Sequence, residues 1–265
     1  MPILELEDTI LYYSVKGTGI PLVFIHPPLL TSANFMYQLE GLSQTFKVIT
    51  FDIRGHGRSG YSEEAITYPL IVEDIIKILE HLDIEKAFIG GYSTGGSIVL
   101  EYLLTKPNRA LGGIIISGMS EVRDFYLKER ISFAVKLAEK KRVPFLNLAI
   151  TWGNADKSRA FLHLFKESSR GEVKNIQQYY RYSLRYNCTR MLPKIDLPVL
   201  LVYGTKDKSF HRYARLLHKK IPHNQLVFLE NEKHQLPTKA ALKLNDVIHQ
   251  FVTHQSNGLK LDEET

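Results

Sequence analysis

Residues 86–104 read KAFIGGYSTGGSIVLEYLL and decide the fold class of this 265-residue chain. The run Lys86–Gly91 is short, apolar and ends in glycine, which is typical of a buried strand. Ser97–Leu104 has the apolar periodicity of a helix, and Pro107 blocks its continuation. The intervening residues 91–95 read GYSTG, a G-x-S-x-G string. We therefore expect Ser93 in a strained strand-to-helix turn, where only very small side chains fit two residues to either side.

The same alternation of strand and helix extends outward from this stretch in both directions. Further apolar runs predict strands at Leu22–His26, Lys47–Phe51, Leu111–Ser117, Leu197–Tyr203 and Gln225–Leu229. Amphipathic stretches at Ile71–Leu82 and Leu242–Val252 predict helices. The pattern indicates an α/β fold, a mostly parallel sheet flanked by helices on both faces. An antiparallel hairpin, Ile3–Glu7 and Ile10–Val15, is expected at one edge.

The alternation stops in the middle of the chain. Helical patterns follow one another at Asp124–Lys141, Pro144–Trp152, Asp156–Ser168 and Val173–Met191. We interpret residues 119–192 as a helical lid inserted after a central strand, and residues 1–118 and 193–255 as the core domain. Residues 256–265 are polar and are expected to form a frayed C-terminal tail.

Tyrosines stand out on the last helix predicted for the lid. Their spacing places Tyr179, Tyr182 and Tyr186 on one face. Two interpretations stay open from the sequence, since these rings either line a pocket or pack the lid onto the core domain.

A serine nucleophile needs a base and an acid that orients the base, and the second half of the chain supplies both. Asp207 follows the predicted strand Leu197–Tyr203, and His234 follows Gln225–Leu229. Because the carboxyl ends of parallel strands meet at one crevice, we expect both residues near Ser93. The order Ser93, Asp207, His234 is that of a nucleophile, acid and base on such a sheet.

Other residues compete for these roles. Glu121 is the first carboxylate after the strand Leu111–Ser117 and is the rival acid. Four further histidines lie near strand ends, and we interpret them as structural or merely exposed: His26, His56, His211 and His223. The single cysteine, Cys188, is interpreted as a packing residue of the lid.

Taken together, these motifs resemble the α/β-hydrolase family, in particular its small lid-bearing members, over nearly the whole chain. Residues 52–59, DIRGHGRS, add a match to the D-x-R-G-x-G-x-S turn of that family. The resemblance implies an α/β-hydrolase fold, a Ser93–His234–Asp207 triad, and structural roles for Asp52, Arg54 and His56.

The chain departs from the family at the loop expected to bind the oxyanion. That loop normally reads His-Gly-X, where the X backbone N–H binds the developing charge, but here residues 26–29 read HPPL. Pro28 has no N–H to donate. Thr94 N–H remains as one donor, and Leu29 N–H becomes the second if the loop is shifted by one residue. The alternatives are a side chain, Thr31 or Ser32, or no second donor.

Composition excludes several classes of protein. Hydrophobic residues make up 44% and charged residues 23%, which is ordinary for a globular chain. One cysteine excludes a disulfide framework or thiolate metal cluster, and no apolar run is long enough to span a bilayer. The start, MPILELEDT, lacks the features of a secretory signal. We expect a cytoplasmic protein without stable membrane insertion.

The net charge of +6 is concentrated in one segment. Residues 121–192 contain 15 Lys and Arg against 7 Asp and Glu, whereas the rest of the chain is slightly acidic. No nucleic-acid-binding motif accompanies this segment, so we expect no nucleic-acid partner. The excess charge either lies on solvated helix faces or attracts an anionic ligand or surface.

These observations predict a serine hydrolase that cleaves an ester-like acyl bond of a small organic substrate, without metal or organic cofactor. Carbon–carbon bond cleavage, lactone opening and acyl transfer remain alternatives, because the resemblance implies the same triad for each. A slowly reacting ligand sensor or partner-binding protein is the alternative of another class, since fold alone does not define function.

Overall fold

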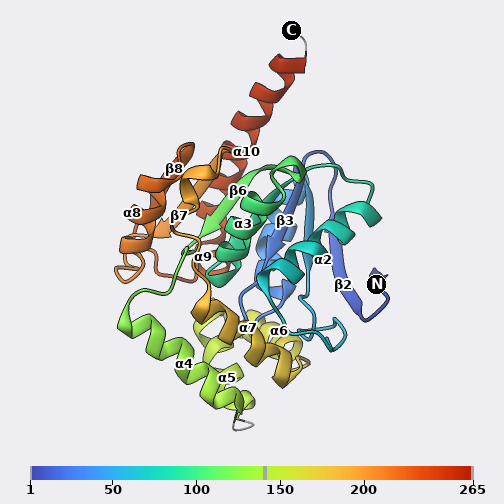
Figure 1. Ribbon diagram of the computed structural model, residues 1–265, viewed down its shortest axis with the longest axis vertical. Coiled ribbons are helices and arrows are strands. Elements are labelled where there is room, and N and C mark those ends of the chain that lie inside the picture. Colours follow the sequence, from blue (N-terminus) through green and yellow to red (C-terminus); the bar gives the residue numbers. More distant parts are fainter. Residues whose placement is uncertain (1, 140–141, 264–265) are drawn as a thin grey trace.

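The sheet of this computed structural model, which describes residues 2–139 and 142–263, forms the centre of the molecule (Figure 1). The described residues form eight strands in the order β1-β2-β4-β3-β5-β6-β7-β8. The first two are antiparallel to their neighbours and the others are parallel. Their bounds are β1 Ile3–Glu5, β2 Ile10–Lys16, β3 Pro21–Ile25, β4 Lys47–Phe51, β5 Ala87–Tyr92, β6 Ala110–Ile116, β7 Val199–Gly204 and β8 Asn224–Leu229.

The strands expected from the sequence are confirmed, with ends displaced by at most two residues. Every residue of the central strands β5 and β7 is buried, because helices cover both faces of the sheet there. The edge strand β8 is only partly buried. The N-terminal hairpin pairs Ile3 with Tyr12 and is antiparallel, as expected.

Helices cover the two faces of the sheet with two separate apolar cores. On one face pack α2 (Tyr68–His81), α3 (Thr94–Thr105) and α8 (His211–Lys220). The other face is covered by α1 (Met36–Gly41) and α10 (Ala241–Glu263), with the short α9 (Leu236–Lys239) between them. Short 3-10 turns complete the connections at Ser32–Phe35, Leu42–Gln44, Pro107–Arg109 and Leu192–Lys194.

The prediction of a frayed tail from Ser256 was wrong up to Glu263, because α10 continues to that residue. Buried Ile248, Phe251 and Val252 anchor the helix on the sheet. Once a helix is anchored, each further residue adds a backbone hydrogen bond at little additional cost. The remaining residues 264 and 265 lie outside the described residues.

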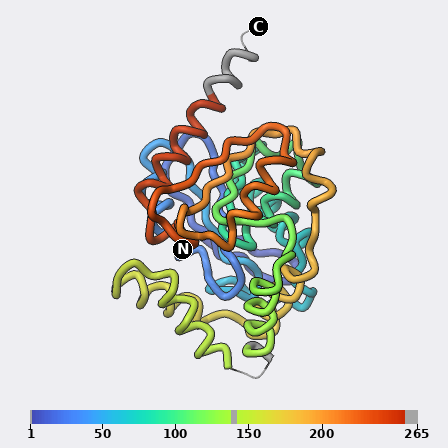
Figure 2. Tube along the Cα trace, turned by 90° about the vertical axis from the view of Figure 1, so that its left-hand side faces the viewer, coloured from blue at the N-terminus to red at the C-terminus, as the bar shows by residue number. Residues whose placement is uncertain are grey.

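Four helices lie between β6 and β7 and gather at one end of the molecule (Figures 1 and 2). They are α4 (Phe125–Glu139), α5 (Val143–Asn154), α6 (Ser158–Ser168) and α7 (Val173–Arg185). All four were expected, but α7 ends at Arg185 rather than Met191, because Tyr186 has extended backbone and Asn187 pairs with Glu121. We call α4–α7 the insertion; its role as a lid and the domain boundaries around it stay predictions.

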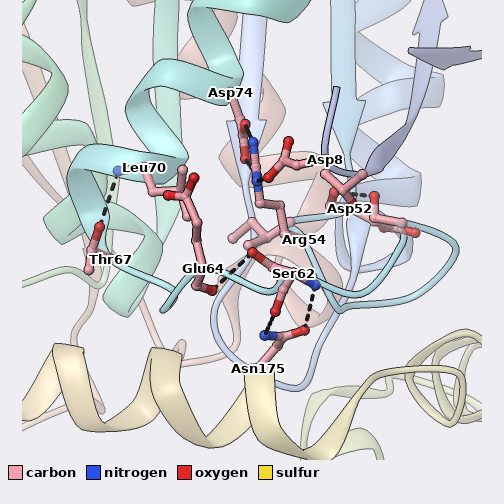
Figure 3. Close-up of polar contacts among 12 residues, drawn as sticks. Asp8, Asp52, Arg54, Ser62, Glu64, Thr67, Leu70, Asp74 and Asn175 are labelled. Atoms are coloured by element: carbon pink, nitrogen blue, oxygen red, sulfur yellow. Dashed lines mark hydrogen bonds and ion pairs between the residues drawn. The ribbon is translucent and has the colours of Figure 1, made fainter. Parts of the chain in front are cut away.

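The turn after β4 joins several parts of the core through polar contacts, as Figure 3 shows. The buried Arg54 guanidinium binds both carboxylate oxygens of Asp74, at 2.7 and 2.8 Å, and also contacts Asp8. Asn175 of α7 bonds the backbone N–H and carbonyl of Ser62. Asp52 accepts the backbone N–H of Ser32 from the loop after β3 and that of Arg58 from its own turn. The turn thus holds the insertion against the core.

Candidate active site

Ser93 occupies the sharp turn that the sequence predicts. It lies between β5 and α3 with φ 55° and ψ −119°, a conformation that few non-glycine residues adopt. A Cβ atom on Gly91 would lie 2.3 Å from the Gly95 carbonyl oxygen, and one on Gly95 would lie 2.2 Å from that of Ile25. Glycine is therefore required at position 91 for the turn to close on α3 and at position 95 for it to pack against β3.

Two loops bring an acid and a base to the same end of the sheet. Asp207 follows β7 and His234 follows β8, and backbone hydrogen bonds from Thr205 and Lys206 join the loops. A Cβ atom on Gly204 would lie 2.3 Å from the Glu232 carbonyl oxygen. The close approach of the loops therefore depends on that glycine.

The three side chains form a continuous series of hydrogen bonds. His234 Nδ1 lies 2.7 Å from Asp207 Oδ2, and His234 Nε2 lies 3.2 Å from Ser93 Oγ. Phe210 packs against the imidazole with ring centres 4.2 Å apart, and Tyr92 lies on it at 5.3 Å. These rings hold the imidazole in place and limit its contact with water. In this arrangement His234 can accept the Ser93 proton while Asp207 stabilises the resulting imidazolium.

Two of the competing histidines are buried and bonded within the core. His26 Nε2 accepts the Ile53 N–H at 2.9 Å, and His56 Nδ1 lies 3.0 Å from the Arg54 carbonyl oxygen. Burial lowers the pKa of His26 to about 4 and the pKa of His56 to about 3. Both imidazoles are therefore neutral at pH 7 and act as structural groups.

The remaining competitors lie away from the hydrogen-bonded series. His211 Nε2 lies 3.0 Å from the Gly204 carbonyl oxygen, and the exposed His223 pairs with Asp196. Glu121, the rival acid, accepts a hydrogen bond from Asn187. Burial raises the pKa of the Cys188 thiol to about 12, which agrees with a packing role.

The loop after β3 has an unusual conformation at Leu29. Its φ is 72°, in the left-handed region, and its side chain is buried. Hydroxyl groups of the insertion hold the loop, since Tyr179 donates to the His26 carbonyl and Tyr180 to the Pro28 carbonyl. The described residues contain no cis peptide bond, so the bonds before Pro27 and Pro28 are trans.

The Thr31 and Ser32 side chains are the alternatives suggested as oxyanion donors. Thr31 Oγ1 accepts the Ala33 N–H, and the Ser32 backbone N–H donates to Asp52, so neither bond uses a hydroxyl proton. The Leu29 N–H donates no hydrogen bond to another backbone group of the described residues. Thr94 is the first residue of α3, where backbone N–H groups have no acceptor within the helix. Leu29 N–H and Thr94 N–H are therefore candidate donors, and the Thr31 and Ser32 hydroxyls stay alternatives.

A cavity of about 450 Å³ lies over Ser93 and His234. Core residues form its floor, and the insertion contributes most of its walls from α4 and α5, with Tyr180 from α7. The walls are mostly apolar and include Leu127, Ile131, Ala134, Leu146, Ala149 and Ile150. Among the described residues of this lining, Arg130 alone carries a full charge. An apolar group of a small molecule fits this space.

The three tyrosines that the sequence placed on one helix face do not line this cavity, and Tyr186 lies just past the end of α7. Tyr179, Tyr182 and Tyr186 pack around Tyr68 of α2, with ring centres 6.1, 4.9 and 4.5 Å from it. The packing interpretation is therefore confirmed. Their neighbour Tyr180 contributes to the cavity instead.

Sequence reasoning missed two residues of the site, Phe210 and Arg130. Phe210 lies three residues after Asp207, and its backbone N–H bonds the Asp207 carbonyl. An aromatic residue soon after a candidate acid is too common a pattern to identify it. Arg130 is one of many basic residues of the insertion, so only its position distinguishes it.

Neither a metal site nor a membrane-spanning helix is found in the described part of the chain. No three His, Cys, Asp or Glu side chains of residues 2–139 and 142–263 gather as ligands for an ion. Among the helices of those residues, none combines the length and the apolar character needed to cross a bilayer.

Comparison with known proteins identifies the family. The family model described as alpha/beta hydrolase fold matches residues 20–237, so the chain belongs to the α/β-hydrolase family. It is 25% identical to the AB hydrolase superfamily protein YisY of Bacillus subtilis, over 92% of this chain and 96% of that protein. It is 26% identical to the human serine hydrolase BPHL, over 91% and 82% of the two chains.

A solved structure confirms the fold independently. The esterase EaEST from Exiguobacterium antarcticum superposes with a TM-score of 0.85 at 21% identity, covering 95% of this chain and 98% of its own. At that identity the likeness concerns the fold. The family match itself supports a hydrolase that acts on small substrates.

Proposed function

We propose that this protein is a serine hydrolase that cleaves an ester-like acyl bond of a small organic substrate. The single observation that carries the proposal is the hydrogen-bonded series Asp207–His234–Ser93 beneath an apolar cavity. A serine in a strained turn, a base within reach and a buried acid behind it are the parts that acyl transfer needs. The similarity to a human serine hydrolase adds support.

The reaction would begin with attack of Ser93 Oγ on the substrate carbonyl while His234 Nε2 takes the hydroxyl proton. Asp207 keeps the imidazole in the required tautomer and stabilises its charged form. Thr94 N–H and Leu29 N–H bind the oxyanion of the tetrahedral intermediate. His234 then protonates the leaving group, and water activated by the same imidazole releases the acyl group from Ser93. We expect no metal or organic cofactor in these steps.

The substrate class follows from the cavity. Its apolar walls favour a hydrocarbon acyl group. Lactone opening, acyl transfer and carbon–carbon cleavage would use the same three side chains, so the triad does not distinguish them from ester hydrolysis. We also propose a cytoplasmic location, in keeping with a single, unpaired Cys188.

A fluorophosphonate probe tests the proposal directly, because it reacts covalently with an activated serine. We expect it to label the wild-type chain and Ser169→Ala, a change at an exposed serine of the insertion, but not Ser93→Ala. Short p-nitrophenyl esters should be hydrolysed with the same dependence on Ser93. A folded wild-type protein that the probe does not label would favour the sensor alternative.

Part of the substrate is proposed to be anionic, and Arg130 is the residue we expect to bind it. Its guanidinium lies 5.6 Å from the centre of the Tyr126 ring on the same helix and lines the cavity. Burial raises the pKa of the Tyr92 and Tyr180 hydroxyls, and the Arg130 charge opposes this rise at both. The positive charge of Arg130 is therefore felt at two residues that line the cavity. An arginine there suits a carboxylate.

Two esters that differ in one carboxylate test this assignment. Arg130→Gln should raise KM for mono-p-nitrophenyl succinate about tenfold or more, since charge-assisted bonds contribute about 1.5–3 kcal/mol, and leave p-nitrophenyl butyrate nearly unchanged. Lys136→Gln removes the same charge from an exposed position of α4 outside the cavity lining and is the matched control. Equal effects of the two variants on the succinate ester would contradict the assignment.

A further inference from the structure

The outer face of α5 is apolar and exposed to solvent. Phe145 is 73% exposed, Leu148 49% and Trp152 69%, and these residues recur at the spacing of one helix face. No charged residue occurs from Val143 to Ala155. A surface helix normally presents polar side chains outward, so this face departs from what a helix surrounded by water requires.

The neighbouring helices extend this surface. Phe133 of α4 is 61% exposed and Leu162 of α6 is 64% exposed, and both helices contact α5. Trp152 also packs edge-on against Phe161 of α6, with ring centres 5.5 Å apart. We call Phe133, Phe145, Leu148, Trp152 and Leu162 the apolar face of the insertion. Large exposed side chains gathered on adjacent elements indicate an interaction surface rather than scattered surface residues.

The charge of the same segment selects the partner. From Phe125 to Lys166 the sequence contains nine Lys and Arg against three Asp and Glu. Exposed members follow and precede α5 directly, at Lys157, Arg159 and Arg142. A second copy of this chain would bring two basic segments together, and their repulsion opposes such a dimer. An anionic lipid surface complements both the apolar side chains and the positive charge.

We propose that the apolar face of the insertion docks on an anionic phospholipid surface, with α5 lying in the plane of the headgroups. Trp152 suits this boundary, because its indole ring is apolar and its N–H is polar. Phe133 and Phe145 belong to the apolar face and also line the cavity over Ser93. A lipophilic ester dissolved in the bilayer would thus reach the cavity along apolar side chains. Docking itself does not depend on the proposed reaction.

The single tryptophan of the chain makes the test specific, because Trp152 lies on the apolar face. Vesicles of equal parts phosphatidylcholine and phosphatidylglycerol should shift its emission to shorter wavelength and carry the protein into the pellet. Phosphatidylcholine vesicles alone should bind at least tenfold more weakly. Raising the salt from about 0.05 M to 1 M should release the protein, because the screening length falls to about 3 Å.

Variants distinguish docking through the apolar face from binding elsewhere on the molecule. Leu148→Ser combined with Leu162→Ser should weaken vesicle binding at least tenfold, since neither side chain lines the cavity and both are exposed. Leu242→Ser, on the 82% exposed leucine of α10, is the matched control and should bind like the wild type. Ser93→Ala should also bind normally, so docking can be assessed even if the protein proves not to be a hydrolase.

Three results would overturn the proposal. The first is no emission shift with anionic vesicles at low salt. The second is equal binding of wild type and the Leu148→Ser, Leu162→Ser variant. The third is an emission shift that depends on protein concentration without vesicles and accompanies dimer formation in sedimentation, which would assign the apolar face to a second copy.

Discussion

Replacing Asp207 by asparagine should remove most of the activity while the fold remains intact. The carboxylate is 7% exposed and lies 2.7 Å from His234 Nδ1. An asparagine amide at this place donates a hydrogen bond to Nδ1, which moves the imidazole proton to Nε2. That nitrogen, 3.2 Å from Ser93 Oγ, then has no lone pair with which to accept the hydroxyl proton.

The size of the loss follows from the role of the acid. The wrong tautomer in a serine–histidine–aspartate series lowers kcat by about 10⁴, which corresponds to about 5 kcal/mol of activation free energy. Asparagine has nearly the shape of aspartate, and the Ser209 hydroxyl bond to Oδ1 can persist. We therefore expect the melting temperature to change little.

Initial rates of p-nitrophenyl butyrate hydrolysis measure the effect, with thermal melting as the check on folding. Glu121→Gln is the control, because it removes the rival acid, which bonds Asn187 and not His234. It should keep nearly full activity. If Asp207→Asn stays within tenfold of the wild-type rate while Glu121→Gln loses activity, the assignment of the acid is wrong.

Three further predictions concern the elements that support this site. Leu29→Pro should abolish ester hydrolysis, because proline lacks the N–H and cannot adopt φ 72°. Leu29→Gly should remain active. Equal rates of hydrolysis for the two variants would exclude Leu29 as a donor. Gly95→Ala should prevent fluorophosphonate labelling, because its Cβ would lie 2.2 Å from the carbonyl oxygen that ends β3. Gly153→Ala should label normally, because the added Cβ meets no atom within 4 Å beyond the local backbone of α5. The protein should lose stability as the pH falls below about 6.5, which is the pKa of a histidine in the unfolded chain. Burial lowers the pKa of His26 to about 4 and that of His56 to about 3. Between these pKa values only the unfolded chain binds the two protons, and this favours unfolding. The free energy of unfolding, measured with urea, should be lower at pH 5 than at pH 7 by about 2 kcal/mol for each histidine. His56→Asn should reduce this difference between the two pH values. An unchanged difference would show that His56 does not contribute to it.

Strand ends were predictable because their determinants are local. Apolar runs of five to seven residues, several of them bounded by glycine or proline, are typical of strands that helices cover on both sides. These runs predict the positions of β3 to β7 in the chain. The chain length of α10 was not predictable in the same way. Asn257 and Gly258 are typical of helix ends, yet α10 continues past them to Glu263, beyond the buried Phe251 and Val252 that anchor it.

Within the candidate site, Ser93, Asp207 and His234 could be named from the sequence because each follows a strand whose carboxyl end lies at a common crevice. The cavity could not be derived in this way. Which side of α4 faces Ser93 depends on how α4 packs against α7 and α5. That packing separates Arg130, which lines the cavity, from the exposed Lys136 of the same helix.

The succession of strands and helices, the tight turn at Ser93 and the placement of three polar residues after strand ends can be inferred from the amino-acid order, because spacing and backbone sterics act over a few neighbours. Three features emerge only from the folded molecule: Leu29 takes a positive φ, Tyr180 rather than its neighbours lines the cavity, and α5 exposes Phe145 and Trp152 to solvent. These features depend on contacts between segments far apart in the chain, and such contacts leave no periodic pattern in the sequence.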